Sequence, residues 1–320
     1  MNGVQRILVI KLSALGDMIL GLPACARIRA AHPEASITLL TTPPFLALAR
    51  ACPYFDTVET DGRPRDLRGW LALVRRLRGA RYVRVYDLQT NDRTNLIFQA
   101  LRPFPPAWSG TAFGCALPHR NPGRMRLHSL ERHAEQLRDA GIWPNAPVTT
   151  LSAPPPDVSW MTPGVPPRTG EERRILLVPG AAARRPAKRW PAEHYAELAA
   201  RLNGLGYAVD VLGTVEESAL ARVIKAKAPS ARDLTGSTTL FQLAARGARC
   251  TLAVGNDTGP MHLIAAAGAP CVSLFSADSD PAVSAPRGRV SVLRAPDLRD
   301  LSVDAVFAAV EAALASDYSM

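Results

Sequence analysis

The pattern that most constrains the fold is an alternation of short β-rich runs with amphipathic helical segments along nearly the whole chain. Ile7–Lys11, for example, is an apolar run that predicts a strand, and Met18–Ala31 predicts the helix after it. Further strands and helices are predicted at 36–40, 82–87, 174–178, 192–203, 208–212, 216–227, 251–254, 261–267 and 271–275. Alternation of this kind indicates βαβ units that build parallel sheets.

A proline-rich segment divides this pattern in two. Residues 151–170 contain six prolines, which interrupt helices and central strands, and 320 residues suit two domains. We predict an N-terminal domain (1–155), a linker (156–171) and a C-terminal domain (172–320) that ends in a helix over 303–315. Two such doubly wound domains would face a central cleft, with ligands at the carboxyl ends of the strands.

Positive charge is concentrated in the first half of the chain. Residues 1–150 hold 20 lysines and arginines against 11 acidic residues, a surplus of +9, whereas residues 151–320 hold 18 against 17, a surplus of +1. Such a field favours nucleic acid, anionic lipid or a phosphorylated substrate. General solubility is the alternative, but it does not require the charge to lie in one half.

The cysteines indicate a reducing compartment. Their number is odd and no pair has metal-type or redox-type spacing, so Cys25, Cys52, Cys115, Cys250 and Cys271 are expected to be small core residues. No apolar run approaches the roughly 18 residues of a membrane span. The apolar stretch near the N-terminus is too short for a signal peptide. We therefore expect a cytoplasmic protein.

The loop after the first predicted strand, Leu12–Asp17, lacks the dinucleotide-binding pattern G-x-G-x-x-G, because Gly16 is its only glycine. A conventional NAD site is therefore disfavoured. Asp17 stands where the next helix begins, at the edge of the sheet where ligands bind. Two interpretations of Asp17 remain open from its position: a helix N-cap and a catalytic base.

A second loop, Val254–His262, leads from a predicted strand through Gly-Asn-Asp-Thr-Gly into a helix. Backbone N–H groups at a helix N-terminus, together with the helix dipole, bind anions. Thr258 and Gly259 would let a phosphate approach closely, and Pro260 suits a first helical position. The alternative is an ordinary capped helix, and His262 alone is more often structural.

Two more loops of the second half follow predicted strands. The first, 178–191, carries Arg184, Arg185, Lys188 and Arg189. A lysine there would suit a leaving diphosphate as a compact charge, whereas a solvated loop is the plainer interpretation. The second, 213–217, ends in Glu216 and Glu217. An acidic residue in this place often accepts hydrogen bonds from ribose, or it can simply favour the start of a helix.

Asp278-Ser279-Asp280 resembles the D-x-D motif with which some sugar transferases hold Mg²⁺ or Mn²⁺. It lies beside Pro281, and no other carboxylate cluster supports it. We therefore predict no metal site.

The segment 66–79 has apolar residues at helical spacing with arginines on its other faces, and eight arginines lie within 63–84. A basic amphipathic helix of this kind can lie on a membrane surface, and a core-packed helix with a charged outer face is the alternative. The density of arginine favours anion binding. The candidate acceptor-binding residues are Ser13, Arg63, Arg65, Arg75, Arg76 and Arg78. The last three are expected off the apolar stripe, so that replacing them would change folding little.

Taken together, three of these motifs resemble glycosyltransferase family 9, which includes the ADP-heptose:lipopolysaccharide heptosyltransferases. They are RILVIKLSALGDMI with the following Leu22-Pro23, then Lys188–Pro191, and finally Asn256–Leu263. Their order and spacing match the family too. The resemblance is clear over roughly 6–60 and 174–282 and thin in between.

The resemblance implies a GT-B fold: an α/β protein with two Rossmann-like domains, the first for the acceptor and the second for a nucleotide-sugar donor. It also implies inversion at the sugar, without metal or other cofactor. Carried over by motif, Asp17 is the base. Lys188, Thr258 and Gly259 contact the donor phosphates. Glu217, Asp257 and His262 contact the donor nucleoside or sugar.

We therefore expect an enzyme that moves a heptose from ADP-heptose to an anionic lipopolysaccharide core acceptor at the inner membrane surface, with no nucleic-acid partner. Alternatives within the family are transfer of another sugar and heptosylation of a protein. Outside it, an NAD-dependent oxidoreductase is weakened by the missing glycine loop. A nucleotide- or lipid-binding protein without turnover is weakened by the presence of both Asp17 and the complete 254–262 loop.

Overall fold

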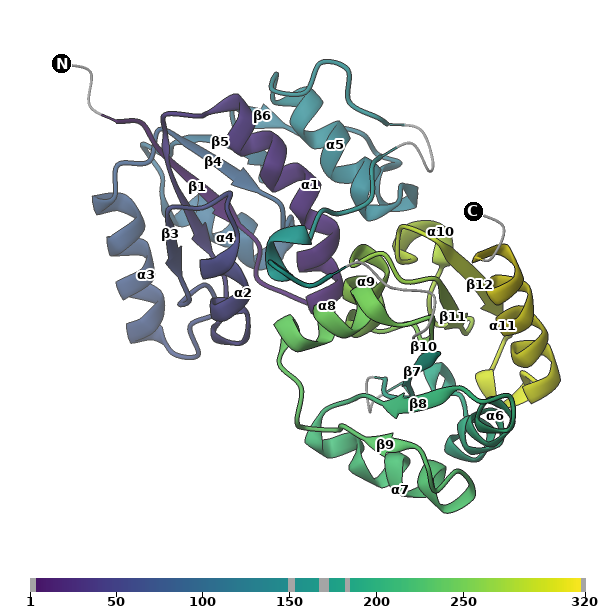
Figure 1. Ribbon diagram of the computed structural model, residues 1–320. Helices are drawn as coiled ribbons and strands as arrows, with labels where there is room; N and C mark the ends of the chain where they lie inside the picture. Colours follow the sequence, from purple (N-terminus) through teal and green to yellow (C-terminus); the bar gives the residue numbers. More distant parts are fainter. Residues whose placement is uncertain (1–3, 149–152, 167–172, 182–184, 318–320) are drawn as a thin grey trace. The chain divides into compact units, whose positions relative to one another are not determined.

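The computed structural model describes residues 4–148, 153–166, 173–181 and 185–317. The chain divides into two compact units, Met1–Pro156 and Asp157–Met320, each built around its own parallel sheet (Figure 1). Residues 167–171 of the expected linker, the neighbouring residues 149–152 and 172, and Arg184 of the cationic loop lie outside the described residues.

The first unit, as far as it is described, has a six-stranded parallel sheet of order β3-β2-β1-β4-β5-β6. The strands are β1 (Arg6–Ile10), β2 (Ser36–Leu40), β3 (Thr57–Glu59), β4 (Arg84–Asp87), β5 (Ala107–Gly110) and β6 (Leu117–Pro118). The helices are α1 (Leu15–Ala31), α2 (Leu46–Ala51), α3 (Leu67–Gly79), α4 (Asp92–Ala100) and α5 (Ser129–Asp139), with 3-10 turns η1 (Pro43–Phe45) and η2 (Arg124–Arg126). Helices α3 and α4 pack on the face that carries Leu8, Ile10 and Val85, and α1 packs beside α5.

The second unit repeats this plan, with a sheet of order β12-β11-β10-β7-β8-β9 among its described residues. The strands are β7 (Arg174–Val178), β8 (Ala208–Val211), β9 (Arg232–Asp233), β10 (Leu252–Asn256), β11 (Cys271–Phe275) and β12 (Val290–Arg294). The helices are α6 (Ala192–Gly204), α7 (Ser218–Lys227), α8 (Leu240–Arg249), α9 (Gly259–Ala266), α10 (Pro281–Ser284) and α11 (Val303–Asp317). The 3-10 turns are η3 (Ser159–Met161), η4 (Pro186–Lys188), η5 (Val215–Glu217) and η6 (Leu298–Asp300). Helices α6, α7 and α11 share one buried apolar cluster with the central strands.

The predicted parallel α/β architecture is confirmed, and the differences lie at element ends. Helix α1 begins at Leu15, three residues before the prediction, because its first turn closes on Ala14. Strand β10 continues to the buried Asn256, whose backbone pairs with Leu274. Helix α7 starts at Ser218, after a 3-10 turn that contains both glutamates of the 213–217 loop.

Part of the expected linker is folded. Val158 and Met161 are buried, and the segment around them belongs to the second unit. All five cysteines, each of them described, are buried as predicted and form no disulfide. No helix in the described ranges combines the length and apolar character needed to cross a bilayer.

Candidate active site

The strand order of the first sheet reverses between β1 and β4, and open parallel sheets bind ligands at such a point, beyond the carboxyl ends of the strands. Two loops meet there, one after each strand. Gln89 joins them, because its Oε1 accepts hydrogen bonds from the N–H groups of Leu12 at 2.8 Å and Ser13 at 3.3 Å. The loop that leads to Asp17 is therefore held by a residue 77 positions away from Leu12.

Asp17 is the third residue of α1 and is partly exposed. Its Oδ2 accepts a hydrogen bond from the N–H of Ala14 at 3.2 Å, and Ala14 itself occupies the N-cap position. The N-cap interpretation of Asp17 is therefore wrong in position, although the carboxylate does stabilise the helix start from within the first turn. Its role as a base remains a prediction.

Two cations lie within electrostatic reach of Asp17. Lys11 is buried, and its Nζ donates to the carbonyl of Leu88 at 3.0 Å. Burial lowers the pKa of Lys11, and the charge of Asp17 opposes this. Burial likewise lowers the pKa of Arg132, on α5, and Asp17 again opposes it. Neither residue was predicted from the sequence, since Lys11 ends a predicted strand and Arg132 lies outside the recognised motifs.

Two more arginines border the same loops. Arg63 donates to the hydroxyl of Ser13, and Arg124 Nη2 donates to Thr90 Oγ1 at 2.6 Å. Together with the two cations near Asp17, they give this edge of the sheet a positive field that suits an anionic acceptor. The structure thus brings two of the acceptor candidates, Ser13 and Arg63, to the Asp17 loop. Arg124 was not foreseen.

Three other acceptor candidates lie elsewhere. Arg75, Arg76 and Arg78 are all in the second half of α3. Arg78 lies at the end that leads toward β4 and contacts the segment before β5, away from the edge that carries Asp17. Arg76 instead reaches the end of β3, two strands away from β1. Arg75 is exposed, and so is Arg65 in the loop before α3. Among the described residues, neither Arg76 nor Arg78 bonds to the Asp17 loop, and the acceptor role of the three arginines stays a prediction.

Arg76 and Arg78 also have structural partners. Arg76 pairs with Glu59 and, at 2.5 Å, with Asp61. Arg78 Nη2 donates to the carbonyl of Ala100 at 2.7 Å. Replacing these arginines would remove the hydrogen bonds to their partners, but pairs at the surface contribute little to stability. The expectation that folding would change little therefore stays a prediction.

A buried carboxylate, Asp87, holds the loop that carries Gln89. Its Oδ1 accepts hydrogen bonds from the N–H groups of Gln89 at 3.0 Å and Thr90 at 2.9 Å. Burial raises the pKa of Asp87 from an ordinary value of 3.8 to about 6, although these hydrogen bonds and Lys11 act in the opposite direction.

The raised pKa of Asp87 predicts a particular pH dependence of stability. The folded chain holds this proton more tightly than the unfolded chain, so the free energy of unfolding falls as pH rises from about 4 to about 6. Asp87→Asn cannot ionise and escapes this loss. Its Tm relative to wild type should therefore be higher at about pH 7.5 than at about pH 4.5, as measured by calorimetry.

Asp56→Asn provides a control of opposite sign. Burial of Asp56 is outweighed by the hydrogen bond from Ile37 and the pairing with Arg29, so its pKa is lowered. Its contribution to stability is present at higher pH and is lost on acidification. Equal Tm differences at both pH values for Asp87→Asn would contradict the prediction.

In the second sheet the strand order reverses between β7 and β10, and Asn256 organises that point. This fully buried residue ends β10. Its Nδ2 donates to the carbonyl of Pro179 at 2.8 Å, while its Oδ1 accepts from the Trp190 N–H at 3.2 Å and the Tyr195 hydroxyl at 3.1 Å. Asn256 therefore ties the loop after β7 and the Lys-Arg-Trp-Pro motif to the start of the 257–259 turn.

Lys188 and Asp257 form an ion pair at this point, with Nζ and Oδ2 separated by 2.5 Å and about a tenth of each side chain exposed. Helix α9 begins just beyond it. Thr258 is its N-cap residue, without a side-chain capping hydrogen bond, and Gly259 is its first residue. The N–H groups of the first turn form a positive helix end near the lysine. The structure thus gathers Lys188, Asp257, Thr258 and Gly259 into a place suited to phosphate.

Glu217 turns back over two glycines. Its Oε2 accepts hydrogen bonds from the N–H of Thr214 at 2.7 Å and from its hydroxyl at 3.3 Å. A Cβ on Gly180 would collide with the Glu217 carboxylate, and a Cβ on Gly213 would lie 2.6 Å from Oε2. These glycines follow the neighbouring strands β7 and β8 and make room for the carboxylate. Glu217 therefore stabilises the start of η5 and also lies at the ligand-binding edge.

The remaining candidates have mainly structural surroundings. His262 is buried within α9, with 6% of its surface exposed. Arg189 Nη2 donates to the carbonyl of Ala181 at 2.7 Å, whereas Arg185 is exposed. Asp280 caps α10 by accepting from the N–H of Ala282 at 3.0 Å. Within the described ranges, no three His, Cys, Asp or Glu side chains are grouped so that they could hold a metal ion.

Comparisons with known proteins find similar sequences and a similar fold. The family model described as glycosyltransferase family 9 (heptosyltransferase) matches residues 123–297, more than half of the chain. Lipooligosaccharide heptosyltransferase 2 of Haemophilus influenzae is 37% identical over 115 residues, which cover 34% of this chain and 33% of that protein. Lipopolysaccharide heptosyltransferase 2 of Salmonella typhimurium is 29% identical over 304 residues, 86% of this chain and 84% of that protein. The solved structure of E. coli ADP-heptose lps heptosyltransferase II matches with a TM-score of 0.77 and 25% identity, covering 98% of this chain and all of that one.

Proposed function

Because the chain belongs to glycosyltransferase family 9 and has the GT-B fold, we propose that it transfers a heptose from ADP-heptose to a lipopolysaccharide core acceptor. The name of the Salmonella relative includes lipopolysaccharide, and the name of the E. coli structure includes ADP-heptose as well. These names support both proposed substrates. The observation that carries the proposal is the buried Lys188–Asp257 pair at the start of α9, because a lysine beside a helix N-terminus suits a diphosphate.

In the proposed reaction the acceptor hydroxyl attacks the anomeric carbon of the heptose from the face opposite the diphosphate, which inverts that centre. Asp17 takes the hydroxyl proton as the new C–O bond forms. The bond from the anomeric carbon to the phosphate oxygen breaks, and ADP leaves with the electron pair. Lys188 and the N–H groups of α9 stabilise the charge that develops on the leaving phosphate.

The two units divide this work in the proposal. The first supplies the base and an acceptor site bordered by Lys11, Arg63, Arg124 and Arg132, whose charges suit the phosphates and carboxylates of a lipopolysaccharide core. The second binds the donor, with Glu217 accepting hydrogen bonds from ribose and the 257–259 turn holding the phosphates.

A thermal-shift panel of nucleotides tests the proposal, followed by a transfer assay on the stabilising sugar. ADP-heptose and ADP should raise Tm, and a ligand at 100 times its Kd should stabilise by about 2.7 kcal/mol. Uridine diphosphate sugars and NAD should not. Stabilisation by NAD alone would favour an oxidoreductase. Binding of ADP-heptose without transfer to a lipopolysaccharide core would point to another acceptor, such as a protein.

Metal removal gives a second test. Lys188 and the helix end supply the positive charge that a divalent cation would otherwise bring to the diphosphate, and Asp280 is engaged as a helix cap. Excess EDTA should therefore leave the initial rate of transfer within about twofold of its value without chelator. Loss of activity that only Mg²⁺ or Mn²⁺ restores would show that a metal takes part.

A further inference from the structure

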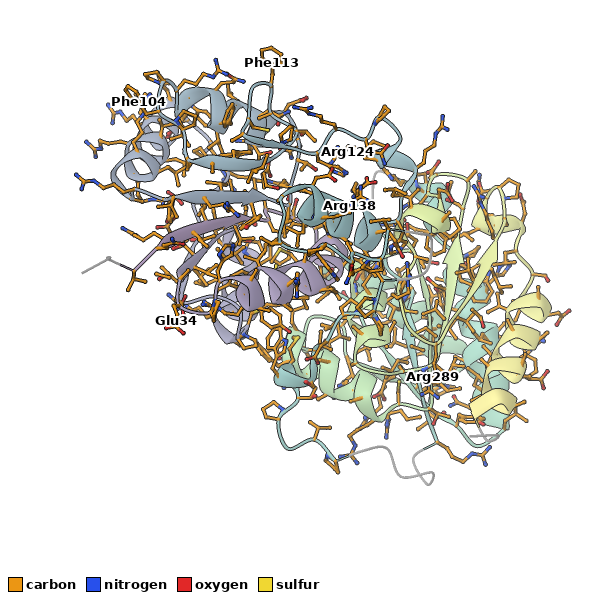
Figure 2. All side chains as sticks on the ribbon, turned by 90° about the horizontal axis from the view of Figure 1, so that it is seen from above. Glu34, Phe104, Phe113, Arg124, Arg138 and Arg289 are labelled. Carbon is orange, nitrogen blue, oxygen red and sulfur yellow. The ribbon has the colours of Figure 1, made fainter. Side chains whose placement is uncertain are left out.

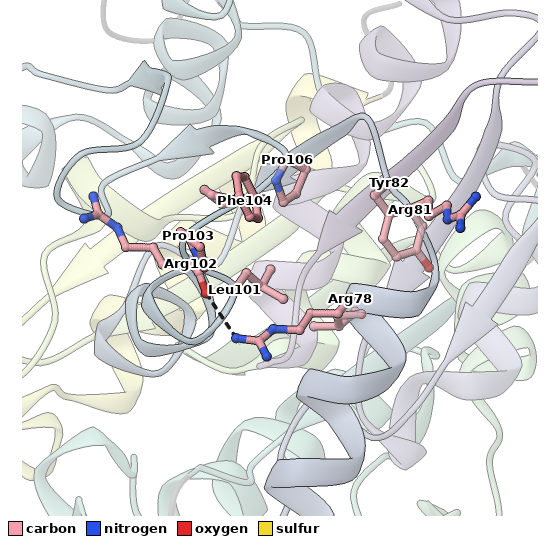
Figure 3. A pocket seen from close by; sticks show the side chains of 10 residues that line it. Arg78, Arg81, Tyr82, Leu101, Arg102, Pro103, Phe104 and Pro106 are labelled. Atoms are coloured by element: carbon pink, nitrogen blue, oxygen red, sulfur yellow. Dashed lines mark hydrogen bonds between the residues drawn. The ribbon is translucent and has the colours of Figure 1, made fainter.

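A surface hollow of about 460 Å³ lies in the first unit, lined by residues 77, 78, 81, 82 and 101–106. These segments precede β4 and β5, so the hollow lies at the edge where the strands begin, and not at the edge that carries Asp17. Its lining includes Arg78, Arg81 and Arg102 and no acidic residue. Figure 3 shows Arg78 reaching toward the backbone of the 101–102 segment, with Phe104 and Pro106 opposite Tyr82.

The contacts of these arginines are with uncharged groups. Arg78 donates to two backbone carbonyls, and the Arg102 guanidinium lies 5.8 Å from the ring centre of Phe98. Among the described residues, no carboxylate forms an ion pair with Arg78, Arg81 or Arg102. The hollow therefore keeps its positive charge, in contrast to Arg76 on the same helix, which pairs with two acidic residues.

Two phenylalanines stand beside this charge with their rings in solvent. Phe104 is 91% exposed and Phe113 is 88% exposed, and Figure 2 shows both rings projecting from the ribbon of the first unit. Their loops are adjacent, because Gln99 Nε2 donates to the Phe113 carbonyl at 3.1 Å and Gly114 lies against the Arg102 guanidinium. Single exposed apolar residues are ordinary, but two nearly bare rings flanking a basic hollow mark an interaction site.

We propose that this surface, formed by Arg78, Arg81, Arg102, Phe104 and Phe113, docks on an anionic lipid bilayer. The rings would enter the headgroup region, where apolar side chains gain by leaving water. The arginines would approach lipid phosphates, each strengthening binding by about fivefold. An anionic membrane offers both an apolar region for the exposed rings and phosphates for the unpaired arginines, so the two features together indicate it more strongly than either does alone. The inference rests on the proposed function for a lipid-borne acceptor.

The position of the surface also constrains the acceptor. A strand of four or five residues spans roughly 15 Å, so docking at the edge where the strands begin would hold Asp17 at about that height above the headgroups. The reacting hydroxyl then belongs to a carbohydrate core that projects from the membrane, and not to the lipid itself.

Vesicle co-sedimentation of the full chain tests the proposal. Wild type should bind vesicles that contain phosphatidylglycerol, bind phosphatidylcholine vesicles weakly, and dissociate as salt rises. Phe104→Ser/Phe113→Ser should reduce partitioning at least about tenfold, with Tm unchanged because both rings are exposed. Arg81→Gln/Arg102→Gln should lose the preference for the anionic lipid.

The matched control is Leu67→Ser/Leu71→Ser, which removes two exposed apolar side chains from the other end of α3 (70% and 59% exposed). This variant should bind as wild type does. Absence of wild-type binding, equal binding by the phenylalanine variant, or equal loss in the leucine control would each overturn the proposal. Self-association through the phenylalanines without vesicle binding would also overturn it, by assigning the surface to a second copy.

Transfer to a delipidated, water-soluble core oligosaccharide separates this proposal from the proposed function. The docking variants should match wild type with that acceptor and fall behind only with acceptor in vesicles. Suppose that neither wild type nor any variant transfers sugar, but that all of them bind vesicles as expected. The proposed function then fails and the docking surface stands.

Discussion

Replacing Asp17 with asparagine should lower the rate of sugar transfer by about 10²–10⁴-fold, which is the range for loss of a general base. Asparagine keeps a side-chain oxygen that can accept the hydrogen bond from the Ala14 N–H, so the start of α1 should persist. It cannot take up a proton from the acceptor hydroxyl. Affinity for ADP, measured by calorimetry, should stay near that of wild type, because the proposed donor site is in the second unit.

A matched variant separates catalysis from helix stability. Asp304 is also an acidic residue in the first turn of a helix, α11, and pairs with Arg201 at the surface. Asp304→Asn removes a comparable charge from a helix start without touching the proposed site. Its turnover should equal that of wild type. Undiminished turnover in Asp17→Asn, with the fold intact, would exclude Asp17 as the base.

Replacing Lys188 with methionine should lower transfer by about 10²–10³-fold, as expected when a group that stabilises a developing anion is lost. Affinity for ADP should fall by about tenfold or more, because a charge-assisted contact with phosphate disappears. Asp257→Asn should instead raise the affinity for ADP, because it removes the carboxylate that balances the charge of Lys188 in the wild type. Titration calorimetry with ADP measures both changes.

The folding consequences of these variants are also distinguishable. Lys188→Met leaves the Asp257 carboxylate largely buried without its partner, which is costly. The double variant Lys188→Met/Asp257→Asn removes both charges and should recover stability without recovering ADP affinity. Lys227→Met, which removes an exposed lysine paired with Glu197, is the control and should leave ADP binding unchanged. Wild-type ADP affinity in the folded Lys188→Met single variant would rule out Lys188 as a phosphate ligand.

The architecture could be predicted from the sequence, because the features that specify it are local. Alternating strands and helices, and the glycine-containing turns after β7, β8 and β10, can be recognised within short windows. The element ends shifted where one side chain closed a turn, as Asp17 does at the start of α1.

The surroundings of the proposed site could not be predicted in this way. Gln89 reaches Leu12 across 77 residues, and Arg132 interacts with Asp17 from α5, outside the motifs recognised in the sequence. Helical periodicity placed Arg76 on the outer face of α3, but it could not show that Glu59 and Asp61 lie beside it. Contacts of this kind depend on the packing of distant segments, which no local pattern reports.

The position of the Glu217 carboxylate beside Gly180 affects how the enzyme would distinguish ribose from deoxyribose in the nucleotide. One oxygen, Oε2, serves Thr214, and the other, Oε1, faces the space where a Cβ of residue 180 would lie. If the donor ribose occupies that edge, as proposed, Oε1 is the acceptor for its hydroxyls. A deoxyribonucleotide would displace water from this carboxylate without a hydroxyl to donate a hydrogen bond in return. Sites built to bind a hydroxyl reject analogues that lack the hydroxyl. The second unit would then distinguish ribonucleotides from deoxyribonucleotides through Glu217 and the space that Gly180 and Gly213 leave for it, without contact to the base.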